Sequence, residues 1–206
     1  MSVVSTTVRP SVAEHHAPGP HKFTIEEYFE LARLNFISGR TELVSGEIIH
    51  MPPIGMGHSL ALEDLRDLLR QAFPKPWCIL TQSTHNLGPN DAREPDIRLL
   101  RESPPLTEIP GPIPVELIVE IAATSLVIDL GEKRLQYARH QVPEYWVVDL
   151  KRSVVHVLRE PNANATVAEL AYGRVEVVGV TGTLRPLANP GATIKVADFM
   201  PSAAIE

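Results

Sequence analysis

The chain has little cysteine, no long apolar run and no excess of positive charge, and each of these shortages excludes a class of protein. Its one cysteine, Cys78, can form neither an intrachain disulfide nor a cysteine-based zinc site. No apolar stretch approaches the roughly 20 residues that span a bilayer. The N-terminus lacks the basic and apolar segments of a signal peptide. We therefore expect a cytoplasmic protein that makes no contact with a membrane.

Acidic residues outnumber basic residues by 25 to 19, which gives a formal net charge of −6. This balance argues against a protein that coats nucleic acid without sequence preference, because such binding needs many contacts between cationic side chains and phosphates. It leaves room for an enzyme in which a local basic groove lies beside acidic metal ligands. The length of 206 residues and the hydrophobic content of 44% fit one folded domain, since a domain has roughly 150 residues.

The N-terminal segment differs in composition from the rest of the chain. Residues 1–22 are rich in Ser, Thr, Pro and His, so we predict a disordered tail followed by a single domain over residues 23–206. A helix is expected to follow Thr24, because Thr24 and Glu27 have the spacing of a capping box.

The later elements alternate between helices and strands. Turn residues and apolar periodicity predict, in order, a hairpin over 42–51, a helix over 58–73, strands at 77–82, 95–100 and 115–121, a helix over 129–140, and strands at 144–149 and 153–159. Asp129 and Glu132, again at capping-box spacing, are expected to begin the third helix. The last fifty residues are β-prone. This order favours an α/β sandwich built on a mixed sheet, with a β-rich C-terminal part.

Two carboxylates interrupt segment 115–121, which otherwise has the composition of a strand buried on both faces. Alternation places Glu116 and Glu120 on the same face of that strand. A solvent-exposed sheet end would explain Glu116. A bound metal ion would compensate the burial of Glu120, and Asp96 supplies a second carboxylate at the start of the preceding strand. Two carboxylates on neighbouring strands can share one Mg²⁺, with waters and backbone carbonyls as further ligands.

The helix after these strands supplies a cation. Lys133 lies one turn into the predicted helix, and Gln136 and Tyr137 follow on the same face. A lysine beside a carboxylate-bound metal can polarise an attacking water and stabilise the charge that develops on a phosphoryl group. A solvated helix lysine is the alternative interpretation. The conjunction of Lys133 with Asp96 and Glu120 favours the site.

Four segments resemble a known family: Glu94-Pro95-Asp96-Ile97, 115–121, 129–138 and 142–149. Through them the chain resembles the putative restriction endonuclease family of the PD-(D/E)XK nuclease superfamily, a bacterial family numerous in cyanobacteria. The resemblance extends over roughly residues 23–200. It implies a restriction-endonuclease-like α/β fold with a mixed sheet flanked by helices. It also implies hydrolysis of DNA phosphodiester bonds with Mg²⁺, for which Mn²⁺ can substitute.

The resemblance assigns roles residue by residue. Asp96 and Glu120 correspond to the two motif acids that bind metal. Lys133 corresponds to the motif lysine, moved from the strand to the adjacent helix, because Ala122 occupies the usual lysine position. Gln141 stands where the family commonly has glycine, which predicts strain at the end of the preceding helix.

Further site residues follow from the same resemblance. Glu42 resembles the additional acid that such nucleases use near the metal, and His58 resembles a histidine of the site. The main-chain carbonyl of Ile121 is an expected metal ligand. Gln136 and Tyr137 are candidates to orient water or to contact phosphate.

We thus expect a Mg²⁺-dependent DNA endonuclease that forms a homodimer by fold analogy, through the edge strands after Glu144. One alternative is a catalytically degenerate module of the same fold that binds nucleic acid or a protein partner. Another is a phosphoesterase that acts on small molecules or RNA. The arginines near the site in sequence are either phosphate contacts or solvated surface charges: Arg93, Arg98, Arg101, Arg134 and Arg139.

Overall fold

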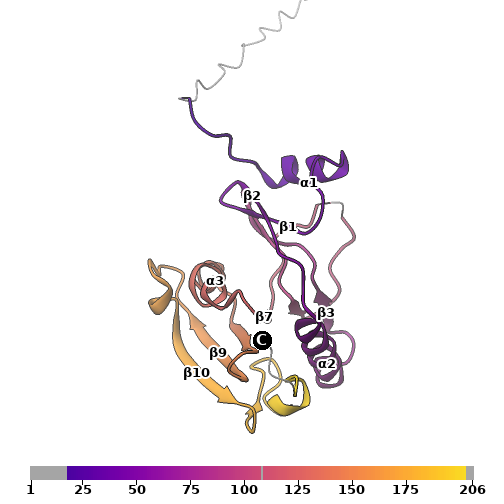
Figure 1. The fold of residues 1–206 in the computed structure, drawn as a ribbon, viewed down its shortest axis with the longest axis vertical. Coiled ribbons are helices and arrows are strands. Elements are labelled where there is room, and N and C mark those ends of the chain that lie inside the picture. The colour runs from indigo at the N-terminus through magenta and orange to yellow at the C-terminus, as the bar shows by residue number, and fades with distance from the viewer. Residues whose placement is uncertain (1–17, 108, 203–206) are drawn as a thin grey trace, which may run out of the picture.

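The computed structural model describes residues 18–107 and 109–202, which form two main sheets with helices against them (Figure 1). One is a six-stranded mixed sheet with the order β10-β9-β8-β7-β6-β3. The other is a four-stranded antiparallel sheet with the order β2-β1-β5-β4. The predicted α/β class with a mixed sheet is confirmed. The predicted N-terminal tail falls largely on residues 1–17, which lie outside the described residues.

The smaller sheet and the first helix form one end of the molecule (Figure 1). Its elements are α1 (Ile25–Arg33), β1 (Thr41–Val44), β2 (Glu47–His50), β4 (His85–Gly88) and β5 (Asp91–Arg93). The capping box at the start of α1 is present, with Thr24 and Glu27 bonded reciprocally. Ser45 and Gly46 both have positive φ, which is the tight-turn geometry expected for the β1–β2 hairpin. We did not predict β4 and β5, because these short strands lack an apolar alternation.

The larger sheet contains the strands predicted in the middle of the chain. Its strands are β3 (Cys78–Thr81), β6 (Ile97–Leu100), β7 (Leu117–Ala122), β8 (Glu144–Asp149), β9 (Val154–Pro161) and β10 (Tyr172–Gly179). Only the β7–β8 pair is parallel among them, with Glu120 opposite Val147. Of the strands after Glu144 in this sheet, only β10 is an edge strand, since β8 and β9 lie inside the sheet. The prediction of dimerisation through an edge strand therefore concerns β10.

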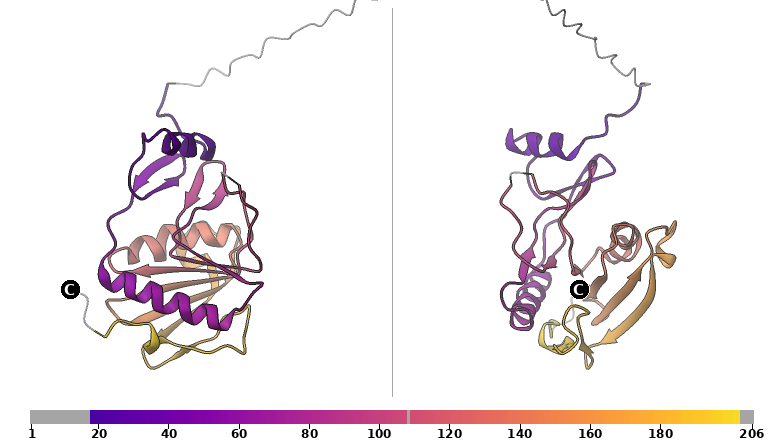
Figure 2. Two further views of the ribbon diagram at one scale, coloured as in Figure 1. Left: turned by 90° about the vertical axis from the view of Figure 1, so that its right-hand side faces the viewer. Right: turned by 180° about the vertical axis from the view of Figure 1, so that it is seen from behind.

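Helices cover the two faces of the larger sheet. Helix α2 (Met56–Ala72) lies against one face, and the continuous helical run α3 (Leu126–Ile128), π-helix η1 (Asp129–Lys133) and α4 (Arg134–Arg139) lies against the other (Figure 2). On the α2 side, β6 and β7 present apolar residues: Leu65 and Leu69 of α2 belong to the same cluster as Leu117 and Val119. The charged residues of β6 and β7 therefore alternate onto the α4 side.

The start of the third helix differs from the prediction. Asp129 does not cap this helix, because its φ of −67° and ψ of −42° are helical and the run already begins at Leu126. The carboxylate of Asp129 instead accepts a hydrogen bond from the Ser125 hydroxyl. The five residues from Asp129 to Lys133 form a π-helical turn, a distortion that is frequent at functional sites. At the other end, Gln141 has a φ of 56°, the left-handed conformation for which glycine is favoured.

The C-terminal part completes the core on the α2 side. It contains the short elements η2 (Ala168–Leu170), β11 (Thr183–Leu184), β12 (Ile194–Lys195) and η3 (Val196–Asp198). Leu184, Ile194 and Phe199 are buried in the same cluster as α2. Within the described part of the chain, no helix is both long and apolar enough to cross a membrane.

Candidate active site

The predicted acids Asp96 and Glu120 lie at the end of β7 that is nearest to the π-turn, and both are buried. Asp96 Oδ2 accepts a hydrogen bond of 2.8 Å from the main-chain N–H of Ile121. His58, in the first turn of α2, places Nε2 2.9 Å from the same oxygen. Because a carboxylate only accepts, Nε2 carries the shared proton. Asp96 is therefore fixed between β7 and α2.

Glu120 is fixed from the opposite side by the helical run. Lys133 Nζ donates to Glu120 Oε1 at 2.9 Å, and the Tyr137 hydroxyl donates to the same oxygen at 2.8 Å. Both donors are buried, with exposures of 4% and 0%. The prediction that Lys133 and Tyr137 share one helix face is confirmed by this common partner.

Lys133 is surrounded by carboxylates. Its Nζ lies 3.5 Å from Asp129 Oδ1 and 3.7 Å from Glu42 Oε1, in addition to Glu120. These charges raise the pKa of Lys133 above its ordinary value, although burial opposes them. Burial raises the pKa of Glu120 to about 8, and the nearby carboxylates add to this effect while Lys133 opposes it. The cluster therefore places three acidic groups around one protonated lysine.

A cavity of about 260 Å³ opens onto this cluster. The site residues among its lining are His58, Asp96, Glu120 and Lys133. Among the hydrogen bonds of the described residues, none involves Asp96 Oδ1 or Glu120 Oε2. One oxygen of each acid thus has no protein partner at a cavity that both acids line.

Glu42 was predicted as a further metal ligand, but the structure engages both of its oxygens with protein groups. Arg93 donates to Oε2 at 2.9 Å, and the Glu94 amide donates to Oε1 at 3.0 Å. Glu42 is not part of the cavity lining. Arg93 and Lys133 hold the pKa of this buried carboxyl below its ordinary value against the effect of desolvation. Its role as a metal ligand stays a prediction.

Gln136 also faces protein groups and not the cavity. Its Oε1 accepts from Arg93 Nε at 2.7 Å, and its Nε2 donates to Asp91 Oδ1 at 2.7 Å. Arg93 also pairs with Glu132 of the π-turn. Gln136 and Arg93 therefore connect the smaller sheet to the helix that presents Lys133.

Two residues of this network were not recognised from the sequence. Arg93 is only 3% exposed, so a solvated surface charge is the wrong interpretation for it. No sequence pattern signalled its burial. Asp129 was interpreted as a helix cap, yet its spacing of four residues from Lys133 is the spacing at which helical ion pairs form. This spacing is the sequence feature that could have indicated the Asp129–Lys133 ion pair.

Comparison with known proteins identifies the family. The sequence profile of the Uma2 family, described as putative restriction endonuclease, matches residues 25–197. The chain belongs to this family. No curated protein sequence matches the chain significantly.

A solved structure shares the fold of this Uma2 family member. It is described as a putative nuclease belonging to DUF820 from Anabaena variabilis, and it superimposes with a TM-score of 0.63 at 16% sequence identity. The match covers 86% of this chain and 97% of the other. Family membership supports a nuclease function, and the solved structure shows the shared fold.

Proposed function

We propose that this chain is a metal-dependent endonuclease that hydrolyses DNA phosphodiester bonds, with Asp96 and Glu120 as its metal-binding acids. The observation that carries the proposal is the shared cavity, where each of these buried acids has one oxygen without a protein partner in the described structure. A buried carboxylate is costly unless it is compensated, and the single lysine faces more than one acid. A divalent cation would compensate the remaining charge.

The donor set fits Mg²⁺. No group of three or more His, Cys, Asp and Glu side chains within residues 18–107 and 109–202 is arranged to hold a metal. Mg²⁺ does not need such a group, because it commonly binds one or two carboxylates and keeps several waters. The N–H of Ile121 points at Asp96, and in a strand the carbonyl of the same residue points to the same edge. The Ile121 carbonyl is thus an added candidate ligand, and Mn²⁺ should substitute because it accepts the same oxygen ligands.

When bound, Mg²⁺ would lower the pKa of a coordinated water and polarise the phosphoryl oxygens. The residues of the chain provide orientation and charge. His58 and the Ile121 amide hold Asp96, while Tyr137 holds Glu120, so the two free oxygens keep fixed directions. Preorganised groups of this kind stabilise a transition state without further rearrangement.

Lys133 is the proposed catalytic cation. It lines the cavity and stays protonated, because the surrounding carboxylates raise its pKa. Its ammonium can donate to a phosphoryl oxygen as negative charge accumulates there. We assign Glu42 and Gln136 to positioning, since both act through Arg93 on the helix that presents Lys133.

The test is cleavage of supercoiled and single-stranded DNA by the wild-type chain, Asp96→Asn and Glu120→Gln, with Mg²⁺ or Mn²⁺ and with EDTA. These substitutions keep the shape of each side chain and remove its charge. We expect metal-dependent cleavage in the wild type and none in either variant. Glu116→Gln is the matched control, because Glu116 precedes the same strand and pairs with exposed Arg101 outside the cluster.

Thermal unfolding with and without metal separates the possible failures. A metal at 100 times its Kd would stabilise the folded wild type by about 2.7 kcal/mol, and the two site variants should lose this effect. Stabilisation without cleavage of DNA would contradict the assigned substrate and favour a phosphoesterase with RNA or small substrates. Neither stabilisation nor cleavage would favour a degenerate binding module.

We retain the homodimer as part of the proposal, with β10 as the edge strand that pairs. Exposed valines at 175, 177 and 180 give this region an apolar surface suited to a second copy. Light scattering at several protein concentrations tests it, and a strictly monomeric chain that cuts both strands would contradict it.

A further inference from the structure

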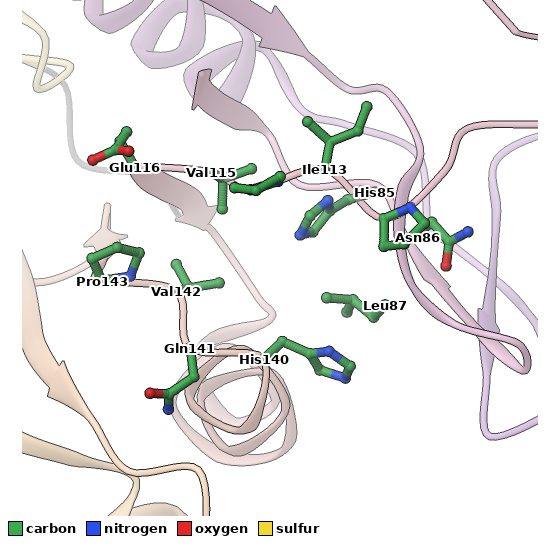
Figure 3. Close-up of a pocket in the computed structure, with 12 residues that line it drawn as sticks. His85, Asn86, Leu87, Ile113, Val115, Glu116, His140, Gln141, Val142 and Pro143 are labelled. Carbon is green, nitrogen blue, oxygen red and sulfur yellow. The ribbon is translucent and has the colours of Figure 1, made fainter. Parts of the chain in front are cut away.

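A second cavity, of about 420 Å³, lies at the other end of β7 and shares no lining residue with the first. It is formed by β4, the loop that leads into β7 and the turn after α4 (Figure 3). In this view His85, Leu87 and His140 lie on one side and Val142, Pro143 and Glu116 on the other. Its apolar lining consists of three prolines and four aliphatic side chains: Pro112, Pro114, Pro143, Leu87, Ile113, Val115 and Val142.

A concave cavity with a mostly apolar lining suits a small ligand. Ligand sites are typically concave, mostly apolar and supplied with a few polar groups that fix orientation. The cavity volume falls within the range of roughly 300–1,000 Å³ that such sites have. The question is therefore which polar group it presents.

The polar group is the imidazole of His85, and its contact with Arg98 determines which ring nitrogen carries the proton. Arg98 donates to His85 Nδ1 at 3.2 Å and to Ser83 Oγ at 2.8 Å. A guanidinium has donors only, so Nδ1 must accept and the proton of the neutral ring is on Nε2. Burial and Arg98 lower the pKa of His85 to about 3, so the ring is neutral at physiological pH. No hydrogen bond among the described residues uses its Nε2.

The positive charge of Arg98, which contacts His85, has no counterion among the described residues. Arg98 is 4% exposed, and no carboxylate in the described part of the chain forms an ion pair with it. Its Nε is buried without a hydrogen-bond partner. Glu116 lines the cavity, yet both of its oxygens accept from Arg101. A buried charge without a counterion is unfavourable, so this end of the molecule disfavours a metal cation and favours an anion.

We propose that this cavity binds a small organic monocarboxylate, with His85 Nε2–H donating to the carboxylate and an apolar body about one ring in size against the prolines. A single buried donor, His85, backed by one guanidinium matches one negative charge, whereas His140 at the cavity is exposed. A phosphate dianion would need more donors than this cavity presents to replace its lost hydration. The proposal is independent of the nuclease function, because the two cavities share no residue.

The experiment titrates the full chain with benzoate, benzamide, acetate and inorganic phosphate by calorimetry, with ¹⁵N NMR of the histidine side chains. Benzoate should bind saturably and shift the His85 Nε2 resonance. Benzamide, which has the same shape without charge, should bind at least about tenfold more weakly, as expected when a charge-assisted hydrogen bond is lost. Acetate should also bind more weakly, because it lacks the apolar body.

Three variants place the binding in this cavity. His85→Phe removes the donor and should abolish benzoate binding. Ile113→Trp fills the cavity from a half-buried loop position, so it should abolish binding even if His85→Phe folds poorly. Ile49→Trp is the matched control on the exposed hairpin and should bind benzoate normally.

Nuclease assays on the same variants keep the two proposals separate. Ile113→Trp should retain any DNA cleavage of the wild type, since it lies outside the first cavity. Equal affinity for benzoate and benzamide, no saturable benzoate binding, or stronger binding of phosphate would each overturn the monocarboxylate proposal. Benzoate binding that survives Ile113→Trp would overturn its location.

Discussion

The two cavities lie at opposite ends of β7 and differ in their nearby charges, although both border the same face of the sheet. At one end, the acids Glu42, Glu120 and Asp129 surround Lys133, and Asp96 lies across the same cavity. At the other end, buried Arg98 has a neutral histidine and a hydroxyl as partners. The first region therefore favours a cation as its ligand and the second an anion.

This difference depends on which charged side chains lie near each cavity and how they are paired. Ile118, in the middle of β7, is fully buried and belongs to the apolar cluster beneath α4. Glu116 and Glu120 flank that middle, where a cavity replaces packed side chains. A charged group is tolerated at such a position if a partner or ligand compensates it. Glu120 supplies an acid at one end of β7, whereas the cation near the second cavity, Arg98, comes from β6, where it is in register with Ile118.

The largest effect is expected when Lys133 is replaced by methionine. The variant keeps an aliphatic stem and loses the only cation that contacts Glu120 Oε1 in the described structure. DNA cleavage should slow by about a hundredfold to a thousandfold, which is typical of the loss of one preorganised electrostatic contact. Single-turnover kinetics at saturating Mg²⁺ measures the effect.

Metal binding should survive this substitution, because Asp96 and Glu120, the acids proposed to bind the metal, both remain. Calorimetric titration of Lys133→Met with Mn²⁺ provides the comparison. Cleavage at the wild-type rate in this variant would show that Lys133 is not catalytic. It would also weaken the contrast between the cation-binding end and the anion-binding end of β7.

A smaller effect, on stability, is expected when Arg93 is replaced by methionine. Removing Arg93 leaves Glu42 buried at 2% exposure with Lys133 as its only nearby cation among the described ion pairs. The free energy of unfolding should fall by about 3 kcal/mol, as for other broken buried ion pairs. Urea denaturation measures the change.

Arg152→Met is the matched control for this prediction. Arg152 also pairs with a buried acid, Asp149, but its own side chain is 69% exposed. Solvent screens such a pair, so the control should lose at most about 1 kcal/mol. Equal losses in both variants would show that burial of the cation does not distinguish these networks.

The smallest effect is a pH dependence that comes from His85. Burial, with Arg98 and His140 nearby, lowers its folded-state pKa from 6.5 to about 3. Between these values the unfolded chain binds a proton that the folded chain does not, so stability falls as the pH drops below 6.5. The slope should approach about 1.4 kcal/mol per pH unit.

Urea denaturation of the wild type and His85→Gln at pH 7 and at about pH 5 tests this sign. The glutamine variant should lose roughly 1–2 kcal/mol less than the wild type over this interval. The same loss in both proteins would show that the histidine does not carry the dependence and would weaken the description of the second cavity.

Much of the fold could be predicted because its signals are local. The capping box at Thr24 and Glu27 and the turn at Ser45 and Gly46 depend on neighbouring residues, and both are present as expected. The strands β6 to β9 have the apolar runs of buried strands. Strands β4 and β5 were missed, since they form by pairing, β5 with β1 and β4 with β5, and not through their composition.

The sequence by itself determined which acids are candidates, because a carboxylate such as Glu120 inside an apolar run requires compensation wherever it lies. Tertiary structure alone decided how each charge is compensated. It buried Lys133 against Glu120, paired Glu42 with Arg93, and buried Arg98 next to His85. These contacts join residues from separate elements over a few ångströms. Interactions between charges depend on distance and burial, and neither can be read from the order of residues in the chain.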